Sequence, residues 1–200
     1  MSALASVVPL AFAGAASASE STCLERWARH YVGVPQTERF QYETEQTIKN
    51  GPTMRTVFRQ IDSTHWMTEA VDPDSLAWTL SHSGTMFTSS DKGKTWSVLR
   101  TIDEAENAAG RKRYEEQAKS ATDAICDQET VDGVTYERLA ANFMSEIGLK
   151  TQNRFTYWVD EATGQVMISR YETEAESFSS VTVQRRVAFD MDDLPRPTSN

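Results

Sequence analysis

The sequence contains little of what a metal or redox site requires. Only two of its 200 residues are cysteine and three are histidine, with no CxxC motif and no paired histidines. The motifs G-x-S-x-G and H-E-x-x-H, the P-loop and the dinucleotide fingerprint are also missing. We therefore predict no metal, no cofactor and no enzymatic activity. The sequence does not distinguish a glycosidase-type carboxylate pair from a solvated face in acidic rows such as Glu43 and Glu45.

Positive charge is scarce as well. Lysine and arginine total 20 against 29 aspartate and glutamate, which gives a net charge of −9 and argues against nucleic acid as a partner. No apolar run reaches the ~20 residues that a helix needs to span a bilayer, so we predict that the protein does not span a membrane. Neither a repeat nor a linker interrupts the chain, and its length fits one domain.

The N-terminus has the pattern of an export signal. Residues 1–18 carry no charge, the run from 4 to 16 is apolar or small, and Ala16-Ser17-Ala18 has the small-x-small form of a cleavage site. We predict a signal peptide at 1–18, a single β-rich domain at 19–200, and a periplasmic or secreted protein. The basic residue that usually begins such a signal is missing, so either translation starts upstream of Met1 or the leader is unusual. The alternative, a buried N-terminal helix, is disfavoured by Pro9 and Gly14.

Export makes the two cysteines informative. An even number of cysteines in an oxidising compartment is usually paired, so we predict a disulfide between Cys23 and Cys126. The alternative for Cys23 is lipidation. The preceding Glu20-Ser21-Thr22 does not resemble a lipobox and argues against it.

Hydrophobic periodicity predicts a mainly β protein with two helices. The helical pattern covers 20–31 and, in a very polar form, 103–123, where the second helix would lie on the surface or over an opening. Strands are expected at 39–45, 54–61, 64–71, 76–82, 85–89, 95–100, 134–143, 154–159, 165–173 and 181–189. The tail from 191 to 200 is expected to be exposed or to follow an edge. This order predicts an α+β fold: a single strongly curved antiparallel sheet, or half-open barrel, with both helices packed against one face.

One segment matches a known turn motif at every defined position. The residues Ser89-Ser90-Asp91-Lys92-Gly93-Lys94-Thr95-Trp96 match the Asp-box form Ser-x-Asp-x-Gly-x-Thr-Trp, which is found in hairpins of sialidase-like propellers. Propellers repeat the box in each blade, whereas this chain contains it once. The motif therefore predicts a hairpin at 85–100 and no sialidase activity.

The order of elements, together with the late hairpin at 154–173, resembles the LolA/LolB and LppX-type group. The hairpin contains Phe155-Thr156-Tyr157-Trp158-Val159-Asp160 followed by a Thr163-Gly164 turn and a return strand. The resemblance implies a half-open β-barrel lidded by helices that holds or shuttles acyl chains in the periplasm or cell envelope. It implies lids at 20–31 and 103–123, and a lipid or lipidated protein as partner.

A carrier sheet needs large apolar side chains that line a cavity, and aromatic residues at strand positions are the candidates. Eight are predicted to line an apolar site: Phe40, Tyr42, Phe58, Trp66, Trp78, Phe87, Phe155 and Tyr157. The same residues also suit an ordinary filled core. In that case the protein would be an envelope interaction or structural module without a ligand. Its acidic surface or the basic cluster Arg111-Lys112-Arg113 would then contact another protein.

Overall fold

The computed structural model describes residues 15–33, 38–146 and 148–198. In chain order the elements are α1 (Ala15–Val32), β1 (Phe40–Ile48), β2 (Thr53–Asp62), β3 (His65–Asp72), β4 (Trp78–His82), β5 (Thr85–Ser89), β6 (Ser97–Thr101), α2 (Glu104–Lys119), β7 (Thr122–Val131), β8 (Val134–Ser145), β9 (Thr151–Val159), β10 (Val166–Glu174) and β11 (Ser179–Val187). Most of the predicted signal peptide, residues 1–14, lies outside the described part. Residues 15–18 form the start of α1, so this helix begins earlier than the predicted 20–31.

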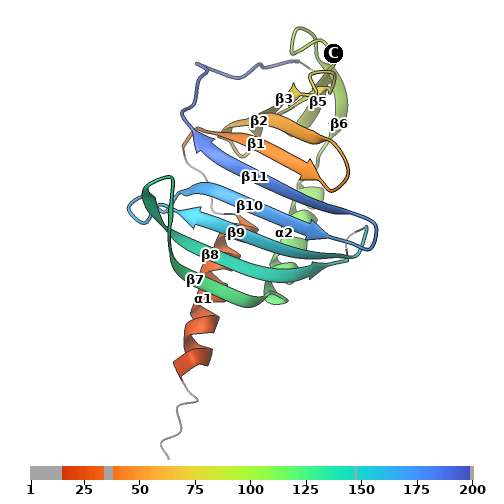
Figure 1. Cartoon of the computed structure of the whole chain (residues 1–200). Coiled ribbons are helices and arrows are strands. Elements are labelled where there is room, and N and C mark those ends of the chain that lie inside the picture. The colour runs from red at the N-terminus through yellow and green to blue at the C-terminus, as the bar shows by residue number, and fades with distance from the viewer. Residues whose placement is uncertain (1–14, 34–37, 147, 199–200) are drawn as a thin grey trace, which may run out of the picture.

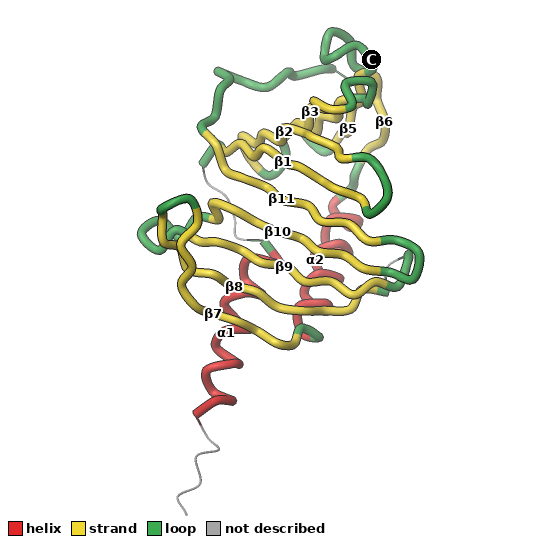
Figure 2. The backbone as a smooth tube through the Cα atoms, in the orientation of Figure 1, coloured by secondary structure: helices red, strands yellow, loops and turns green. Residues whose placement is uncertain are grey.

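The strands form one antiparallel sheet of 11 strands in the order β6-β5-β4-β3-β2-β1-β11-β10-β9-β8-β7. The sheet curves, but its edge strands β6 and β7 do not pair with each other, so the barrel stays open (Figure 1). Both helices lie on the same face of the sheet, here called the helix side, and the opposite face is called the far side (Figure 2). The predicted fold class is therefore confirmed.

The pairing of β1 with β11 joins two consecutive meanders, β1–β6 and β7–β11, into this sheet. It runs from Gln41 opposite Val187 to Ile48 opposite Ser180 without a bulge. Since successive side chains of a strand point to opposite faces, this unbroken register fixes which residues of the two meanders share a face.

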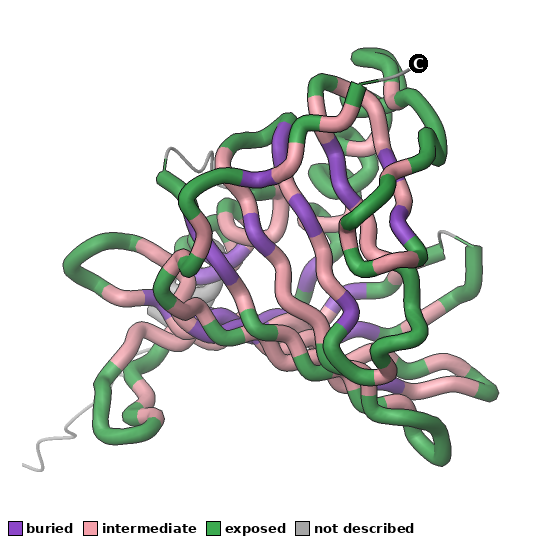
Figure 3. Tube along the Cα trace, turned by 90° about the horizontal axis from the view of Figure 1, so that it is seen from above, coloured by how far each residue is buried: buried purple, intermediate pink, exposed green. Residues whose placement is uncertain are grey.

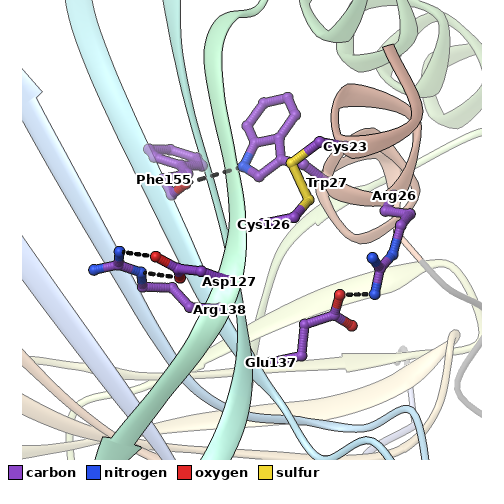
Figure 4. The surroundings of a disulfide bond; sticks show 8 residues. All are labelled: Cys23, Arg26, Trp27, Cys126, Asp127, Glu137, Arg138 and Phe155. Carbon is purple, nitrogen blue, oxygen red and sulfur yellow. Dashed lines mark hydrogen bonds and ion pairs between the residues drawn. A yellow bond between two sulfur atoms is a disulfide. The ribbon is translucent and has the colours of Figure 1, made fainter. Parts of the chain in front are cut away.

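A first core lies under α1 on the helix side. The buried Cys23 and Trp27 lie one turn apart on α1 and pack towards β7, β8 and β9. The other buried members of this core are Ala121, Leu139, Ala141, Phe143, Tyr157 and Val159. The Trp27 indole N–H donates a hydrogen bond of 2.9 Å to the backbone carbonyl of Phe155 (Figure 4).

The predicted disulfide between Cys23 and Cys126 is confirmed, with Cα atoms 5.7 Å apart. It ties α1 to β7, and an ion pair between Arg26 and Glu137 ties the same helix to β8 (Figure 4). The disulfide and the ion pair therefore hold α1 to the sheet close to the point where Trp27 packs on it.

A second core lies on the far side of the sheet, under the C-terminal tail (Figure 3). Met67, Leu80, Phe87 and Leu194 are buried together there. The tail is also fixed by polar contacts, because Arg59 pairs with Asp190 at 2.8 Å and the His65 ring donates to the Pro195 carbonyl at 2.9 Å. The prediction of an exposed or edge-following tail is correct only in part: residues 192, 193, 196 and 198 are exposed, whereas Leu194 is buried on an apolar patch of the short strands and Met191 packs against the same patch.

The Asp-box residues form the turn between β5 and β6, which confirms the predicted hairpin. The Ser89 hydroxyl accepts a hydrogen bond of 2.8 Å from the Gly93 backbone N–H, and Asp91 accepts bonds from the Thr95 hydroxyl and backbone N–H. These bonds, first of all that from the Thr95 hydroxyl, hold the pKa of Asp91 at about 2. Gly93 has a φ of +81°, and a Cβ atom there would lie 3.1 Å from the Trp78 ring, so a larger residue does not fit without a shift.

One strand was not predicted. The expected helix at 103–123 ends at Lys119, and β7 begins at Thr122 and pairs with β8 along its length. The sheet therefore has one strand more than the ten expected, and this strand carries Cys126.

Replacing Gly110 by alanine is expected to stabilise the protein by about 0.5–1 kcal/mol, because glycine in a helix interior loses more backbone entropy on folding than alanine. Gly110 lies within α2, and a Cβ atom added there would meet no other atom within 4 Å. Urea denaturation should show a higher midpoint at unchanged slope. A lower midpoint would contradict the helical placement of this residue.

Candidate ligand-binding site

Four of the predicted aromatic residues form a continuous row across β1, β2 and β3. Phe40 lies 5.2 Å from Tyr42 and 5.9 Å from Phe58, and Phe58 lies 5.9 Å from Trp66, all between ring centroids. The register explains the row, since Tyr42 is opposite Phe58 in the β1–β2 pair and Phe40 shares their face. We call Phe40, Tyr42, Phe58 and Trp66 the aromatic row.

The aromatic row faces the helix side. Tyr42 is opposite Arg186 on β11, and two residues away Gln184 accepts a hydrogen bond of 3.1 Å from the Tyr171 hydroxyl. Tyr171 in turn packs against the core under α1. The row therefore lies on the same face as that core, separated from it by the polar side chains of β11.

Two further predicted residues, Phe155 and Tyr157, also lie on the helix side but belong to the core under α1. The Phe155 ring lies 4.5 Å from that of Tyr171 and 5.7 Å from that of Tyr31 on α1. Tyr157 is buried, and burial raises its pKa well above the usual range. These two rings fill space between helix and sheet, whereas Phe58 and Trp66 of the aromatic row stay half-buried.

The structure does not bring the last two predicted residues to this face. Trp78 and Phe87 share the far side with Leu80, and all three belong to the core under the C-terminal tail. Phe87 is almost completely buried there, against Met67 and Leu80. Six of the eight predicted aromatic residues thus share the helix side and two lie behind it.

The helices cover this face unevenly. The main contacts of α1 are with β7 and β8, and those of α2 are with α1 and β8. Neither helix has its main packing against β1, β2 or β3, where the aromatic row lies. The helix side therefore has a closed half under α1 and a less covered half at the aromatic row.

α2 connects the two free edges of the open sheet, because it follows β6 and precedes β7. Its 16 residues span about 24 Å. None of them is buried. A helix without a buried stripe is not held by a core of its own, so we call α2 the strap helix.

The strap helix is fixed at its two ends. At the start, the Asp103 carboxylate accepts a hydrogen bond of 2.6 Å from the Glu106 backbone N–H, a regular N-cap. Near its end, Gln117 accepts a bond of 2.6 Å from the Tyr31 hydroxyl and donates one of 2.8 Å to Ser145. Among the described residues, side chains 107–112 make no hydrogen bond or ion pair outside the strap helix.

A polar group lies between the aromatic row and the core under α1. Arg186 is half-buried, with its guanidinium carbon 5.4 Å from the centre of the Phe40 ring. The Tyr42 hydroxyl donates a hydrogen bond of 3.0 Å to the Val166 carbonyl. Burial raises the pKa of Tyr42, and the neighbouring Arg186 offsets part of that rise. Burial also raises the pKa of Tyr171, to about 12, so both phenols are neutral at physiological pH.

Two cavities lie elsewhere, and most of the residues in their walls are polar or charged. One of about 830 Å³ lies at the ends of the central strands, with Thr47, Asn142, Arg154 and Glu172 in its wall. Another of about 560 Å³ lies beside α1 and is lined by residues that include Arg26, His30 and Glu137. Burial, with smaller contributions from Arg29 and Arg26, lowers the pKa of His30, which favours its neutral form. None of the eight predicted residues lines either cavity.

Sequence reasoning missed the polar residues of this face. In β11 the apolar positions Val181, Val183 and Val187 alternate with Thr182, Gln184 and Arg186, and the candidate site residues predicted from the sequence include none of the polar series. The register places the polar series on the helix side and the apolar series on the far side. The alternation of apolar and polar residues in β11 could have indicated these polar residues, because a ligand site usually contains a few polar groups among apolar ones.

Within the described ranges, no three His, Cys, Asp or Glu side chains lie close enough to share a metal ion. The same part of the chain contains no helix with the length and apolar composition needed to cross a membrane.

Solved structures of LolA-like proteins are similar to this chain. A LolA superfamily protein from Nitrosomonas europaea is 12% identical, with 88% of this chain and 94% of that chain covered and a TM-score of 0.34. A putative outer membrane lipoprotein-sorting protein domain from Vibrio parahaemolyticus is 11% identical, with 86% and 92% covered and a TM-score of 0.34. The hypothetical lipoprotein YmcC from Escherichia coli is 16% identical, with 79% and 93% covered and a TM-score of 0.35.

The names of these proteins belong to the group that the order of elements and the hairpin at 154–173 resemble. No protein-family model matches the sequence, and a search of curated proteins finds no significant relative. A similarity with TM-scores near 0.34 says nothing about ligand or partner. Those are inferred below from this chain's own residues.

Proposed function

We propose that this protein is an exported binding or carrier protein whose half-barrel accommodates an apolar ligand, a lipid or the acyl chain of a lipoprotein. Residues 19–200 would act as one domain in the periplasm or outside the cell, after removal of residues 1–18. The observation that carries this proposal is the aromatic row, in which Phe40 is buried but Phe58 and Trp66 stay half-buried, on the helix side of a sheet that is not closed.

The aromatic row suits an acyl chain better than a compact polar ligand. Its rings present a continuous apolar surface across three strands, and partly exposed rings gain free energy when an apolar chain covers them. The strap helix supports the same function. It crosses from one sheet edge to the other without burying a residue, so it can move without exposing a core of its own.

The alternative is an envelope interaction module with a filled core and no ligand. A specific observation favours it: on the edge strand β6, the apolar side chains of Val98 and Leu99 are 50% and 54% exposed. An unpaired edge with exposed apolar residues can add a strand from another protein. The basic residues Arg111, Lys112 and Arg113 on the strap helix are also exposed and could contact an acidic partner.

Replacing Trp66 by glutamate is expected to weaken ligand binding by about tenfold or more, because a carboxylate would be placed against an apolar chain. The free energy of unfolding should fall by only about 1–2 kcal/mol, since the ring is half-buried. The probe is parinaryl alcohol, an uncharged polyene whose fluorescence rises on binding. Urea denaturation of the same samples measures stability.

Leu99→Glu is the matched control, because Leu99 is exposed on the edge strand away from the aromatic row. It should bind the probe like the unmodified protein, and an interaction module would lose its partner instead. If the unmodified protein shows no saturable binding of parinaryl alcohol or of the corresponding acid, parinaric acid, the carrier proposal is wrong. If Trp66→Glu lowers the free energy of unfolding by about 3–5 kcal/mol, the loss typical of a fully buried aromatic ring, the row is ordinary core.

A further inference from the structure

We infer that the ligand carries one anionic headgroup, a carboxylate or a phosphate, and that Arg186 binds it at the end of the aromatic row. This inference rests on the proposed function and names the ligand class more closely: a single-chain anionic amphiphile. It depends on the position of Arg186, on the absence of a counter-ion beside it, and on an unsatisfied buried nitrogen.

The position of Arg186 joins it to the apolar surface. It lies on β11 directly opposite Tyr42 of the aromatic row, and its guanidinium stands over the ring of Phe40 at 5.4 Å. Stacking on an aromatic face leaves the edge of the guanidinium, with its N–H donors, free to meet another group. A headgroup at Arg186 would therefore direct its chain along Phe40 and Phe58 towards Trp66.

Arg186 lacks the counter-ion that most other arginines of the sheet have, such as Arg59 and Arg185. Among the described residues no carboxylate lies within 4 Å of it, whereas Arg59 pairs with Glu69 at 2.6 Å and with Asp190 at 2.8 Å. Its sequence neighbour Arg185, on the far side, pairs with Asp132 at 3.2 Å. The segment 34–37, which precedes β1, reads Val-Pro-Gln-Thr and contributes no carboxylate.

The guanidinium is also incompletely hydrogen-bonded. The Tyr42 phenol makes a hydrogen bond with the guanidinium, but in the part of the chain that the structure describes the Nη1 atom of this guanidinium is buried and has no hydrogen-bond partner. The Nη1 atom of Arg59 also lacks a hydrogen bond, but there an ion pair at 2.6 Å compensates, which is not the case at Arg186 among the described residues. A buried donor on a charged group costs free energy unless an acceptor meets it, and an anionic oxygen is the strongest acceptor for arginine. The neighbouring Gln184 does not serve, because its side-chain oxygen already accepts from Ser169 and Tyr171 at 3.1 Å each.

The test compares parinaric acid with parinaryl alcohol, which share one polyene chain and differ in the headgroup. The unmodified protein should bind the acid about tenfold more tightly than the alcohol at neutral pH, the gain expected for a hydrogen bond to a charged group. Arg186→Met should remove this preference while it leaves the affinity for the alcohol within about twofold. Arg186→Lys should restore part of the preference, because it keeps the positive charge.

Arg185→Met is the control, because it removes a neighbouring positive charge of the same strand on the far side and should keep the preference. Equal affinity of the unmodified protein for acid and alcohol would overturn the inference. A preference for the acid that survives in Arg186→Met would also overturn it. If neither probe binds, the proposed function itself fails. Where parinaric acid binds, competition between dodecanoate and dodecyl phosphate shows which anion the site prefers, because the preferred one displaces parinaric acid at the lower concentration.

Discussion

Replacing Cys23 and Cys126 together by alanine lowers the free energy of unfolding by about 3–5 kcal/mol, one of the two largest effects that we expect from a change outside the ligand site. The bond closes a loop with a sequence separation of 103 residues, so its removal frees a large part of the unfolded chain. It also releases α1 from β7, although Trp27 and the Arg26–Glu137 ion pair still hold the helix.

Urea denaturation of the unmodified protein, with and without reductant, measures this effect. Reductant should lower the midpoint of the unmodified protein towards that of the double variant and leave the double variant unchanged. Thiol labelling of the denatured, unreduced protein should find no reactive cysteine, in agreement with the absence of free cysteines among the described residues. A midpoint that does not respond to reductant would show that the bond adds nothing to stability.

Replacing Trp27 by alanine costs about 3–5 kcal/mol of stability, because the indole is completely buried. Its ring stacks on that of Tyr31 at 4.9 Å and lies 5.9 Å from that of Phe143, so its loss leaves a cavity between α1 and the sheet. The disulfide keeps α1 near the sheet in this variant, so the measured loss reflects packing rather than release of the helix.

Trp27→Phe is the control for this prediction. It keeps most of the ring but removes the N–H that donates to the Phe155 carbonyl at 2.9 Å, so it should cost only about 1–2 kcal/mol. Urea midpoints at equal slope separate the two variants. Equal losses for alanine and phenylalanine would mean that the hydrogen bond, and not the volume of the ring, holds α1.

The strands that the sequence predicts most clearly are those with strict alternation or a distinct turn. The hairpin of β1 and β2 and that of β5 and β6 belong to this group, and the Asp-box residues form the expected turn. β7 was missed because its residues, Thr122–Val131, include Asp127, Gln128 and Glu129, and because it follows directly on a strong helix pattern. Pairing with β8, which sequence does not display, makes it a strand.

The site was predictable in part. Alternation within β1 and β2 shows that Phe40, Tyr42 and Phe58 can share a face, and the structure joins them in the aromatic row. Trp78 and Phe87 could not be assigned to a face of the sheet, because β4 and β5 have only five residues each and in β5 the apolar Met86 and Phe87 point to opposite faces. Their placement depends on the register across β3, where a bulge near Gln60 shifts the pairing with β2.

The tail and Arg186 show a second limit of sequence reasoning. Leu194 is one apolar residue in a polar segment without periodicity, and only the patch formed by Met67, Leu80 and Phe87 explains its burial. Arg186 appears in the sequence as an ordinary strand charge. Its lack of a counter-ion becomes visible only when the pairing of β1 with β11 sets it beside the aromatic row.

The central claim is that the half-barrel holds an apolar ligand, and native mass spectrometry tests it most directly. The protein is purified without detergent from a host that exports it, and organic extraction follows on the same sample. The account predicts a bound lipid or fatty acid that is released on denaturation and recovered in the extract. A clean mass of the protein alone, with an empty extract and no binding of either parinaryl alcohol or parinaric acid, would contradict it.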